Sequence, residues 1–232
     1  MKKLVLIVLC LLLIIPVCAG AKNLTVEEKF KKSFPKKNFE SIKPTSIKGV
    51  YEIYDGNQIY YFMPEAEVII YGNIISKDGV NITRESNLKK MAPKMATLPL
   101  DSALKIGNGK TTVTEFMDPD CHFCRQAYSF FSPRQDVTIY IFFFPLSQAS
   151  ERKIRHILCA PDKLKMFEDV MMGKFDNNAS LNICNDKKVD ETIRTHMRLA
   201  SQIGIRATPL FFIKGQVVDG FERNIIEKLL KD

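Results

Sequence analysis

Short apolar runs rich in aromatic and β-branched residues follow one another between residues 48 and 83. Turn signals separate them, of which Asp55-Gly56 and Asp78-Gly79 are the clearest. Asp-Gly pairs between such runs are typical of β-hairpins. A helix is expected ahead of the strands, over residues 26–34. The pattern predicts a small α+β module of two or three strands, whose thin core and open strand edges favour pairing with a second copy of the chain.

The later part of the chain alternates between strand and helix patterns. An almost fully apolar run at residues 137–144 has the length of a strand, which predicts a buried interior position in a sheet. The expected order is strand, helix, strand, a helical block, two strands of a hairpin, and a helix, at residues 111–116, 121–132, 137–144, 154–203, 210–213, 216–218 and 225–230. This order indicates an α/β thioredoxin-type core with helices inserted in its middle.

A charged stretch that contains Pro93 and Pro99 lies between the two patterns. Such a stretch is typical of a connector, and its first part is expected to be helical. The sequence therefore predicts an N-terminal domain over residues 22–83, a linker over residues 84–104 and a second domain over residues 105–232.

The first residues have the features of an export signal. Two lysines precede an apolar run at residues 4–15, and Ala19 and Ala21 follow in an A-x-A arrangement. We expect cleavage after Ala21 and hence an exported chain. Lipidation of Cys18 is the alternative, which the bulky Val17 before it disfavours. A membrane-spanning helix is disfavoured too, because spanning takes about 20 apolar residues.

The formal net charge of the whole chain is +8, and many of the lysines near the start of the mature chain cluster within residues 29–37. No arginine is interleaved with these lysines, as it commonly is in a nucleic-acid-binding patch. The cluster is interpreted as a solvated helix face, and no nucleic-acid partner is expected.

Four of the six cysteines remain after removal of the leader: Cys121, Cys124, Cys159 and Cys184. An even number in an exported chain indicates two disulfides, for which three pairings are possible. A zinc site would need a second closely spaced pair of ligands beside Cys121 and Cys124, and neither the other cysteines nor the histidines supply one. A structural crosslink between Cys121 and Cys124 would close too short a loop to stabilise much. No metal and no cofactor are expected.

A redox function uses more of the local sequence. Cys121 is expected at the first turn of a helix, where the helix dipole and free N–H groups stabilise a thiolate, the species that attacks disulfides. Cys124, one turn later, can then resolve the mixed disulfide. Asp120 is the expected N-cap. Its negative charge opposes thiolate formation, and His122 is the residue expected to tune it.

The run from Phe116 to Arg125, FMDPDCHFCR, resembles the active-site signature of the bacterial periplasmic disulfide isomerases, the DsbC and DsbG family. Thr208-Pro209 resembles the cis-proline loop of thioredoxin folds, which lies beside the redox cysteines and presents backbone to the substrate. Glu115 stands where thioredoxin-like proteins carry a buried acid that relays protons for the second cysteine. The alternative for Glu115 is an ordinary glutamate on an edge strand.

The resemblance extends over nearly the whole mature chain. Residues 49–83 are similar to the cystatin-like dimerisation module of the family. By the same resemblance, Cys159 and Cys184 form a structural disulfide, as in DsbC-like members. Two features depart from the family. His122-Phe123 replaces the common Gly-Tyr dipeptide, and the two prolines of residues 84–104 are expected to interrupt the linker helix.

The resemblance implies a periplasmic thiol-disulfide isomerase that works as a V-shaped homodimer. Cys121 would attack incorrect disulfides in exported proteins, and a membrane thiol reductase of the DsbD type would keep it reduced. Phe123 is expected either to line the client surface or to serve in packing. The alternatives are a DsbA-like dithiol oxidase and a DsbG-like chaperone or client-specific binding module.

Overall fold

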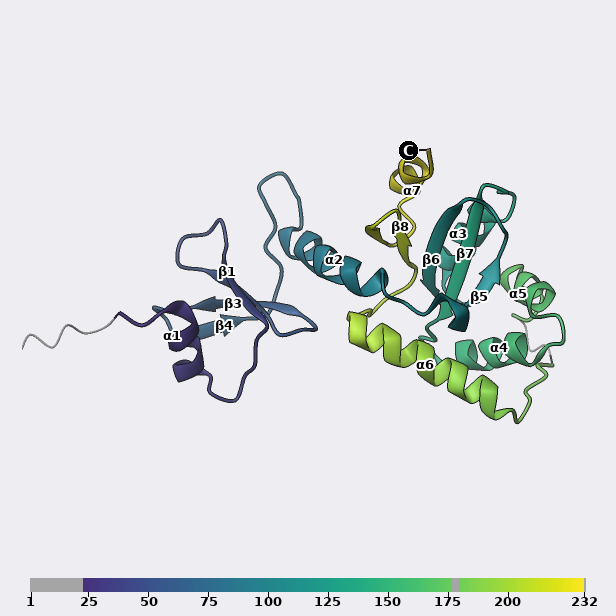
Figure 1. Cartoon of the computed structure of the whole chain (residues 1–232), viewed down its shortest axis with the longest axis horizontal. Helices are drawn as coiled ribbons and strands as arrows, with labels where there is room; N and C mark the ends of the chain where they lie inside the picture. The colour runs from purple at the N-terminus through teal and green to yellow at the C-terminus, as the bar shows by residue number, and fades with distance from the viewer. Residues whose placement is uncertain (1–22, 177–179, 232) are drawn as a thin grey trace, which may run out of the picture.

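The computed structural model describes residues 23–176 and 180–231. The predicted leader, its cleavage point after Ala21 and the alternative at Cys18 lie outside these residues. The described chain forms two sheets with a helix, α2, between them (Figure 1).

The N-terminal domain consists of one helix on a four-stranded antiparallel sheet with the order β1-β2-β3-β4. Its elements are α1 (Val26–Ser33), β1 (Ser41–Pro44), β2 (Tyr51–Tyr54), β3 (Ile59–Met63) and β4 (Val68–Ile70). A capping box between Thr25 and Glu28 begins α1. Phe30 of this helix is fully buried against Ile53, Tyr60 and Phe62 of the sheet, so one sheet face forms the core.

The sheet has one strand more than predicted. β1 pairs with β2 from Ser41 to Pro44, but its sequence, SIKP, contains a single β-branched apolar residue and ends in proline. Such a segment has no recognisable strand pattern, because its place in the sheet comes from pairing with β2.

The linker begins with a continuous helix, α2 (Ile82–Met95), which Asn81 caps through a hydrogen bond to the Arg84 N–H. Pro93 lies within its last turn. The expected interruption at this residue is therefore wrong: a proline so close to the C-terminal end removes one backbone hydrogen bond from a helix that is about to end. Pro99 stands after α2 and begins the short 3₁₀ helix η1 (Leu100–Ser102).

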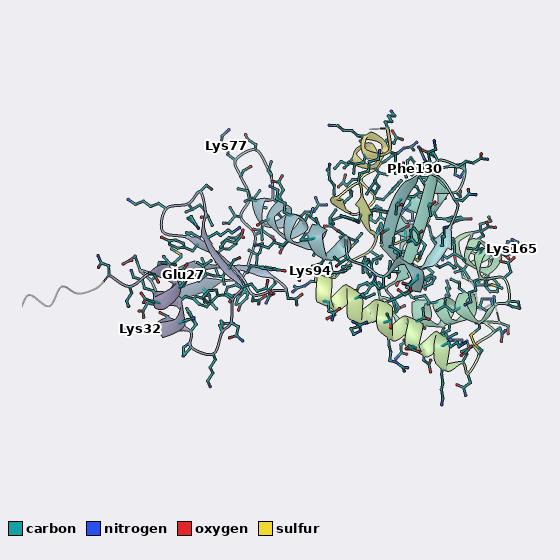
Figure 2. All side chains as sticks on the ribbon, in the orientation of Figure 1. Glu27, Lys32, Lys77, Lys94, Phe130 and Lys165 are labelled. Carbon is teal, nitrogen blue, oxygen red and sulfur yellow. A yellow bond between two sulfur atoms is a disulfide. The ribbon has the colours of Figure 1, made fainter. Side chains whose placement is uncertain are left out.

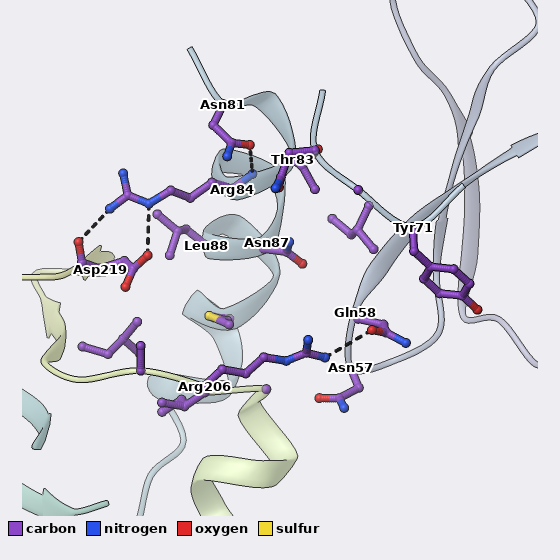
Figure 3. Close-up of a pocket in the computed structure, with 18 residues that line it drawn as sticks. Asn57, Gln58, Tyr71, Asn81, Thr83, Arg84, Asn87, Leu88, Arg206 and Asp219 are labelled. Atoms are coloured by element: carbon purple, nitrogen blue, oxygen red, sulfur yellow. Dashed lines mark hydrogen bonds and ion pairs between the residues drawn. The ribbon is translucent and has the colours of Figure 1, made fainter. Parts of the chain in front are cut away.

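Side chains of α2 contact the second domain. Arg84 donates to the side chain of Asp219 at 3.0 Å and to its carbonyl at 2.7 Å. Near the other end of the helix, Lys94 donates to the carbonyls of Gly56 at 2.6 Å and Gln202 at 2.9 Å (Figure 2). Arg84 and Asp219 border a cleft of about 480 Å³ between the domains, which Figure 3 shows. The linker is thus packed against the second domain.

The second domain contains a five-stranded sheet with the order β5-β7-β6-β8-β9. Its strands are β5 (Leu104–Ile106), β6 (Thr111–Met117), β7 (Val137–Phe143), β8 (Leu210–Ile213) and β9 (Gln216–Asp219). β6 and β7 are parallel, and the remaining neighbours are antiparallel. The predicted thioredoxin-type order is confirmed. β5 was missed, because three residues at the boundary between the predicted linker and the second domain carry too short a pattern to recognise.

Five helices surround this sheet: α3 (His122–Phe131), α4 (Gln148–Cys159), α5 (Lys163–Met171), α6 (Lys187–Ile203) and α7 (Arg223–Lys231). The strand residues alternate between two cores. Val113 and Ile139 pack with residues of α3, α4 and α7, whereas Phe116 and Phe142 stack on each other in a second cluster with α2 and α6. Glu115 has the parity of Val113 and therefore belongs to the side of the sheet that α3 covers.

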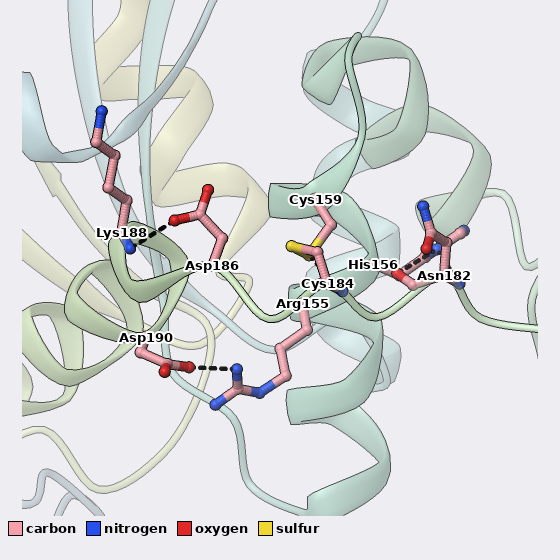
Figure 4. Close-up of a disulfide and its surroundings, with 8 residues drawn as sticks. All are labelled: Arg155, His156, Cys159, Asn182, Cys184, Asp186, Lys188 and Asp190. Atoms are coloured by element: carbon pink, nitrogen blue, oxygen red, sulfur yellow. Dashed lines mark hydrogen bonds and ion pairs between the residues drawn. A yellow bond between two sulfur atoms is a disulfide. The ribbon is translucent and has the colours of Figure 1, made fainter.

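A disulfide joins Cys159, the last residue of α4, to Cys184, with a Cα–Cα distance of 5.7 Å (Figure 4). It closes a loop that contains α5. Nearby, the Asn182 N–H donates to His156 Nδ1 at 2.9 Å. None of the helices in the described part of the chain has the length and apolar character that crossing a membrane requires.

Candidate active site

Cys121 is the N-cap residue of α3, directly after the loop that leaves β6. Its Sγ lies 3.4 Å from the carbonyl oxygen of Thr208, to which the thiol donates. The side chain is partly exposed. Because N–H groups of the first helical turn have no intrahelical partner, a sulfur at the N-cap lies where they can stabilise a negative charge. The prediction that Asp120 is the N-cap is wrong, since the helix begins one residue later.

Cys124 lies one turn into α3 and is fully buried. Burial raises the pKa of the Cys124 thiol, and the nearby Glu115 raises it further. Cys124 therefore stays protonated near neutral pH, while the partly exposed Cys121 is open to a substrate. This asymmetry gives the two cysteines different chemical functions.

Glu115 is 4 % exposed and belongs to β6, the middle strand of the sheet. The alternative of an edge-strand glutamate is therefore wrong. Its Oε1 has no hydrogen-bond partner among the described residues, and the side chain borders a small cavity of about 120 Å³ that Cys124 also lines. Burial raises the pKa of Glu115 well above its usual value, as does the charge of Cys121. A protonated acid beside Cys124 can exchange a proton with the thiol.

The peptide bond between Thr208 and Pro209 is cis. Pro209 is buried at the start of β8, and its carbonyl accepts the Gly220 N–H at 2.9 Å. The Thr208 side chain lies beside Cys124, whose pKa it lowers slightly against the effect of burial. Segments 87 residues apart thus meet at the redox pair.

The loop before Cys121 is fixed by Asp118, which is 1 % exposed. One carboxyl oxygen accepts the Asp120 N–H at 2.6 Å. The other accepts the Leu146 N–H, also at 2.6 Å, from the segment after β7. Asp118 therefore ties the loop to the neighbouring strand and limits the freedom of the residue that precedes Cys121.

A cluster of four charged side chains lies beside the same loop. Lys153 donates to Asp120 and to Asp176, at 2.5 Å each. Arg125 forms a bidentate pair with Asp176 and reaches Asp120 at 3.4 Å. Sequence analysis missed Lys153 and Asp176, because they are 33 and 56 positions beyond Asp120 and nothing in their local sequence indicates a contact.

His122 and Phe123 both face solvent. Phe123 is 55 % exposed, and its ring meets that of His122 edge to face at 5.7 Å. His122 Nε2 lies 3.1 Å from Gln126 Nε2. The packing alternative for Phe123 finds no support in this exposure. Within residues 23–176 and 180–231, no three histidine, cysteine or acidic side chains form a group that could hold a metal ion.

Comparison with known families divides the chain at the same place as the fold. Residues 18–84 match the disulfide bond isomerase protein N-terminal domain. Residues 99–231 match the thioredoxin-like domain.

Similar full-length proteins include the probable thiol:disulfide interchange protein DsbC of Bordetella avium. It is 30 % identical over 194 residues, which cover 82 % of this chain and 67 % of that protein. The thiol:disulfide interchange protein DsbC of Escherichia coli K12 is 26 % identical, over an alignment that covers 78 % of this chain and 76 % of that protein. Among solved structures, the thiol-disulfide exchange protein alpha-DsbA2 from Wolbachia pipientis has the same fold. Its TM-score is 0.50 at 17 % identity, over 66 % of this chain and 98 % of that one.

Proposed function

The chain belongs to the DsbC family of thiol:disulfide interchange proteins, and we propose that it isomerises and reduces incorrect disulfides of exported proteins through Cys121 and Cys124. The observation that carries the proposal is the placement of Cys121. Its sulfur stands at the start of α3, partly exposed, against the carbonyl of Thr208 in the cis-proline loop. The buried Cys124 lies one turn behind it.

The first step is a thiol-disulfide exchange. The Cys121 thiolate attacks one sulfur of a client disulfide, a new S–S bond forms as the client bond breaks, and the other client sulfur leaves as a thiolate. In isomerisation, a different client thiolate attacks the client sulfur of this mixed disulfide. That second exchange releases the Cys121 thiolate and leaves the number of electrons on the client unchanged.

Reduction follows when Cys124 resolves the mixed disulfide. Cys124 loses its proton and attacks the sulfur of Cys121, and the client sulfur leaves as a thiolate that takes up a proton. The client has then gained two electrons and the protein holds a Cys121–Cys124 disulfide. In its ionised form Glu115 is positioned to accept the Cys124 proton, because its carboxyl lies at the same small cavity. We assign Glu115 this supporting function.

A reductant must return Cys121 to the thiolate after each reduction. The family relationship points to a membrane thiol reductase of the DsbD type and to a periplasmic location after removal of residues 1–21. The exposed pair His122 and Phe123 lies where a client or this reductase would approach. We propose that clients bind there through apolar contact and through the backbone of Thr208-Pro209.

A second copy of the chain is proposed as the partner of the N-terminal domain. β4 has a hydrogen-bonded neighbour on one side only, and Val68 and Ile70 on it are 43 % and 46 % exposed. An exposed apolar edge strand is a surface that pairs with another chain. The matched disulfide bond isomerase N-terminal domain supports this assignment.

The function is tested by the refolding of a client with scrambled disulfides. The mature protein should restore client activity, and Cys121→Ala should lose that effect. Cys124→Ala should keep isomerisation but accumulate mixed disulfides. Full recovery with Cys121→Ala would instead favour the chaperone alternative. A Cys121–Cys124 pair that is mainly oxidised in rapidly acid-trapped cells would favour the dithiol oxidase.

A further inference from the structure

Lys153 is a nearly buried cation beside the redox loop. It extends from α4, is 7 % exposed, and places its Nζ between the carboxylates of Asp120 and Asp176. One turn earlier on the same helix, Ser150 donates to the other oxygen of Asp120 at 3.1 Å. The Asp120 carboxylate is thereby held from α4, although it belongs to the loop before α3.

Arg125 completes the cluster from α3. Its Nε donates to the Pro119 carbonyl at 2.8 Å, and its two terminal nitrogens pair with Asp176. The cluster therefore contains two cations and two carboxylates. Asp120, the member next to Cys121 in sequence, is paired with Arg125 and Lys153, and the contact with Lys153 is the shorter by far, at 2.5 Å against 3.4 Å.

Lys153, Arg125 and Asp176 are expected to be charged at neutral pH. Burial lowers the pKa of Lys153, but the hydrogen bonds to Asp120 and Asp176 outweigh it, so that the pKa is raised overall. Hydrogen bonds from Arg125, together with those from Lys153, hold the pKa of Asp176 far below its usual value despite its partial burial. A charged Lys153 is therefore available to compensate Asp120.

We propose that Lys153 is a positioning residue for Cys121, which holds the Asp120 carboxylate in place and compensates the negative charge of this residue, the one that directly precedes the attacking cysteine. The inference rests on the proposed function, in which the Cys121 thiolate attacks clients. An unpaired carboxylate next to Cys121 would repel the thiolate and lower its population at neutral pH. By pairing with Asp120, Lys153 offsets that repulsion.

Other titratable groups near Cys121 do not replace Lys153. Glu115, Cys124 and the loop residue Asp118 are buried, and His122 is exposed. Among the described residues, Asp120 forms ion pairs with Arg125 and Lys153 alone. Loss of Lys153 should therefore leave Asp120 with Arg125 as its ion-pair partner, at the longer distance, and Arg125 also pairs with Asp176.

The test measures the rate at which iodoacetamide alkylates Cys121 as a function of pH, in mature protein carrying Cys124→Ala. Lys153→Met should shift the midpoint of this profile upward by about 0.5 to 1 pH unit. An adjacent like charge can shift a pKa by more than this, but Asp120 is partly exposed, and water screens its charge. Alkylation at a pH below the midpoint should then slow by about 3-fold to 10-fold. Lys153→Arg should retain the profile of the parent protein.

The decisive variant is the double substitution Lys153→Met/Asp120→Asn. It removes both charges, so the profile should return toward that of the parent. A merely structural function of Lys153 would not be rescued in this way. Arg155→Met is the matched control on the same helix: it loses ion pairs to Glu151 and Asp190 but no contact with the redox loop, and it should leave the profile unchanged.

Circular dichroism checks the fold of each variant. If Lys153→Met does not fold, Asp120→Asn alone decides, because removal of the carboxylate should shift the profile downward. An unchanged profile in Lys153→Met, or a shift that Asp120→Asn does not reverse, overturns the proposal, as does an unchanged profile in Asp120→Asn alone. The alkylation assay contains no client, so a failure of isomerisation by the parent protein would refute the proposed function without deciding this inference.

Discussion

The loop closed by Cys159 and Cys184 supports a quantitative prediction about stability. The two cysteines are separated by 25 positions. A crosslink over a loop of this length reduces the entropy of the unfolded chain by an amount worth about 3.5 kcal/mol at 25 °C. The variant Cys159→Ala/Cys184→Ala should therefore lose about 3.5 kcal/mol of unfolding free energy. For a chain of this size, that loss lowers the Tm by roughly 7 to 14 °C.

The structure links this loss of stability to the redox site. Asp176 lies in the loop that the disulfide closes, and it anchors both Lys153 and Arg125 beside Asp120. Without the disulfide the segment that carries Asp176 gains freedom, so the ion pairs at the redox loop should weaken. We expect the alkylation profile of Cys121 to shift upward in the variant, by less than in Lys153→Met.

Urea unfolding followed by far-UV circular dichroism measures the stability, since the chain contains no tryptophan to serve as a fluorescent probe. The reference is the protein with Cys121→Ala/Cys124→Ala, in which Cys159 and Cys184 are the cysteines left in the mature chain. Reduction of this reference with dithiothreitol should reproduce the loss seen in the double alanine variant. A loss below about 1 kcal/mol would refute the reasoning, because it would show that the loop is already constrained in the unfolded state.

Further predictions concern single side chains. Glu115→Gln should remove a pH dependence of stability. Because the pKa of Glu115 is raised in the folded state, the parent protein should lose stability as pH rises above about 4.5. The difference in unfolding free energy between pH 5 and pH 8, measured with urea, should therefore be smaller in the variant. The same substitution should slow resolution of a mixed disulfide by Cys124, measured by quenched-flow release of a model thiol, while initial attack by Cys121 is retained. Phe123→Ala should lower the rate of client refolding by about 3-fold to 10-fold, the equivalent of 0.7 to 1.4 kcal/mol of apolar contact, with alkylation of Cys121 as the unchanged control. Ile70→Lys should shift a dimer toward monomer in light scattering, because it places a charge on the exposed edge of β4; a monomeric parent protein would contradict the proposed dimer instead.

Much of the second domain could be predicted because its elements carry strong local patterns. The run that became β7 is almost wholly apolar, and both of its edges and faces are covered in the structure. The hairpin of β8 and β9 has its turn at Lys214 and Gly215, both with positive φ, where the sequence placed it. In these segments local propensity and tertiary environment agree, which makes a sequence easy to interpret.

The missed elements lack such agreement. β1 and β5 are short and carry no strand pattern of their own, and each is a strand because it pairs with a neighbour, β2 and β7 respectively. The helix start at Asp120 was misplaced by one residue, because a carboxylate next to a helix is a common N-cap. In the structure this carboxylate instead pairs with Lys153.

The sequence predicted that the dipeptide His122-Phe123 tunes the reactivity of Cys121. The structure adds a second group of side chains that can do so, the charged cluster around Asp120. His122 and Phe123 face solvent, where water and salt screen their effect on the sulfur. Lys153 and Asp176 are nearly and partly buried, respectively, so their charges are screened less than groups on the exposed dipeptide. Because screening weakens with burial, substitutions in the dipeptide should alter the choice of client more than thiolate reactivity, and substitutions in the buried cluster should do the reverse. Such an outcome would place redox tuning and client contact on separate residues of the site.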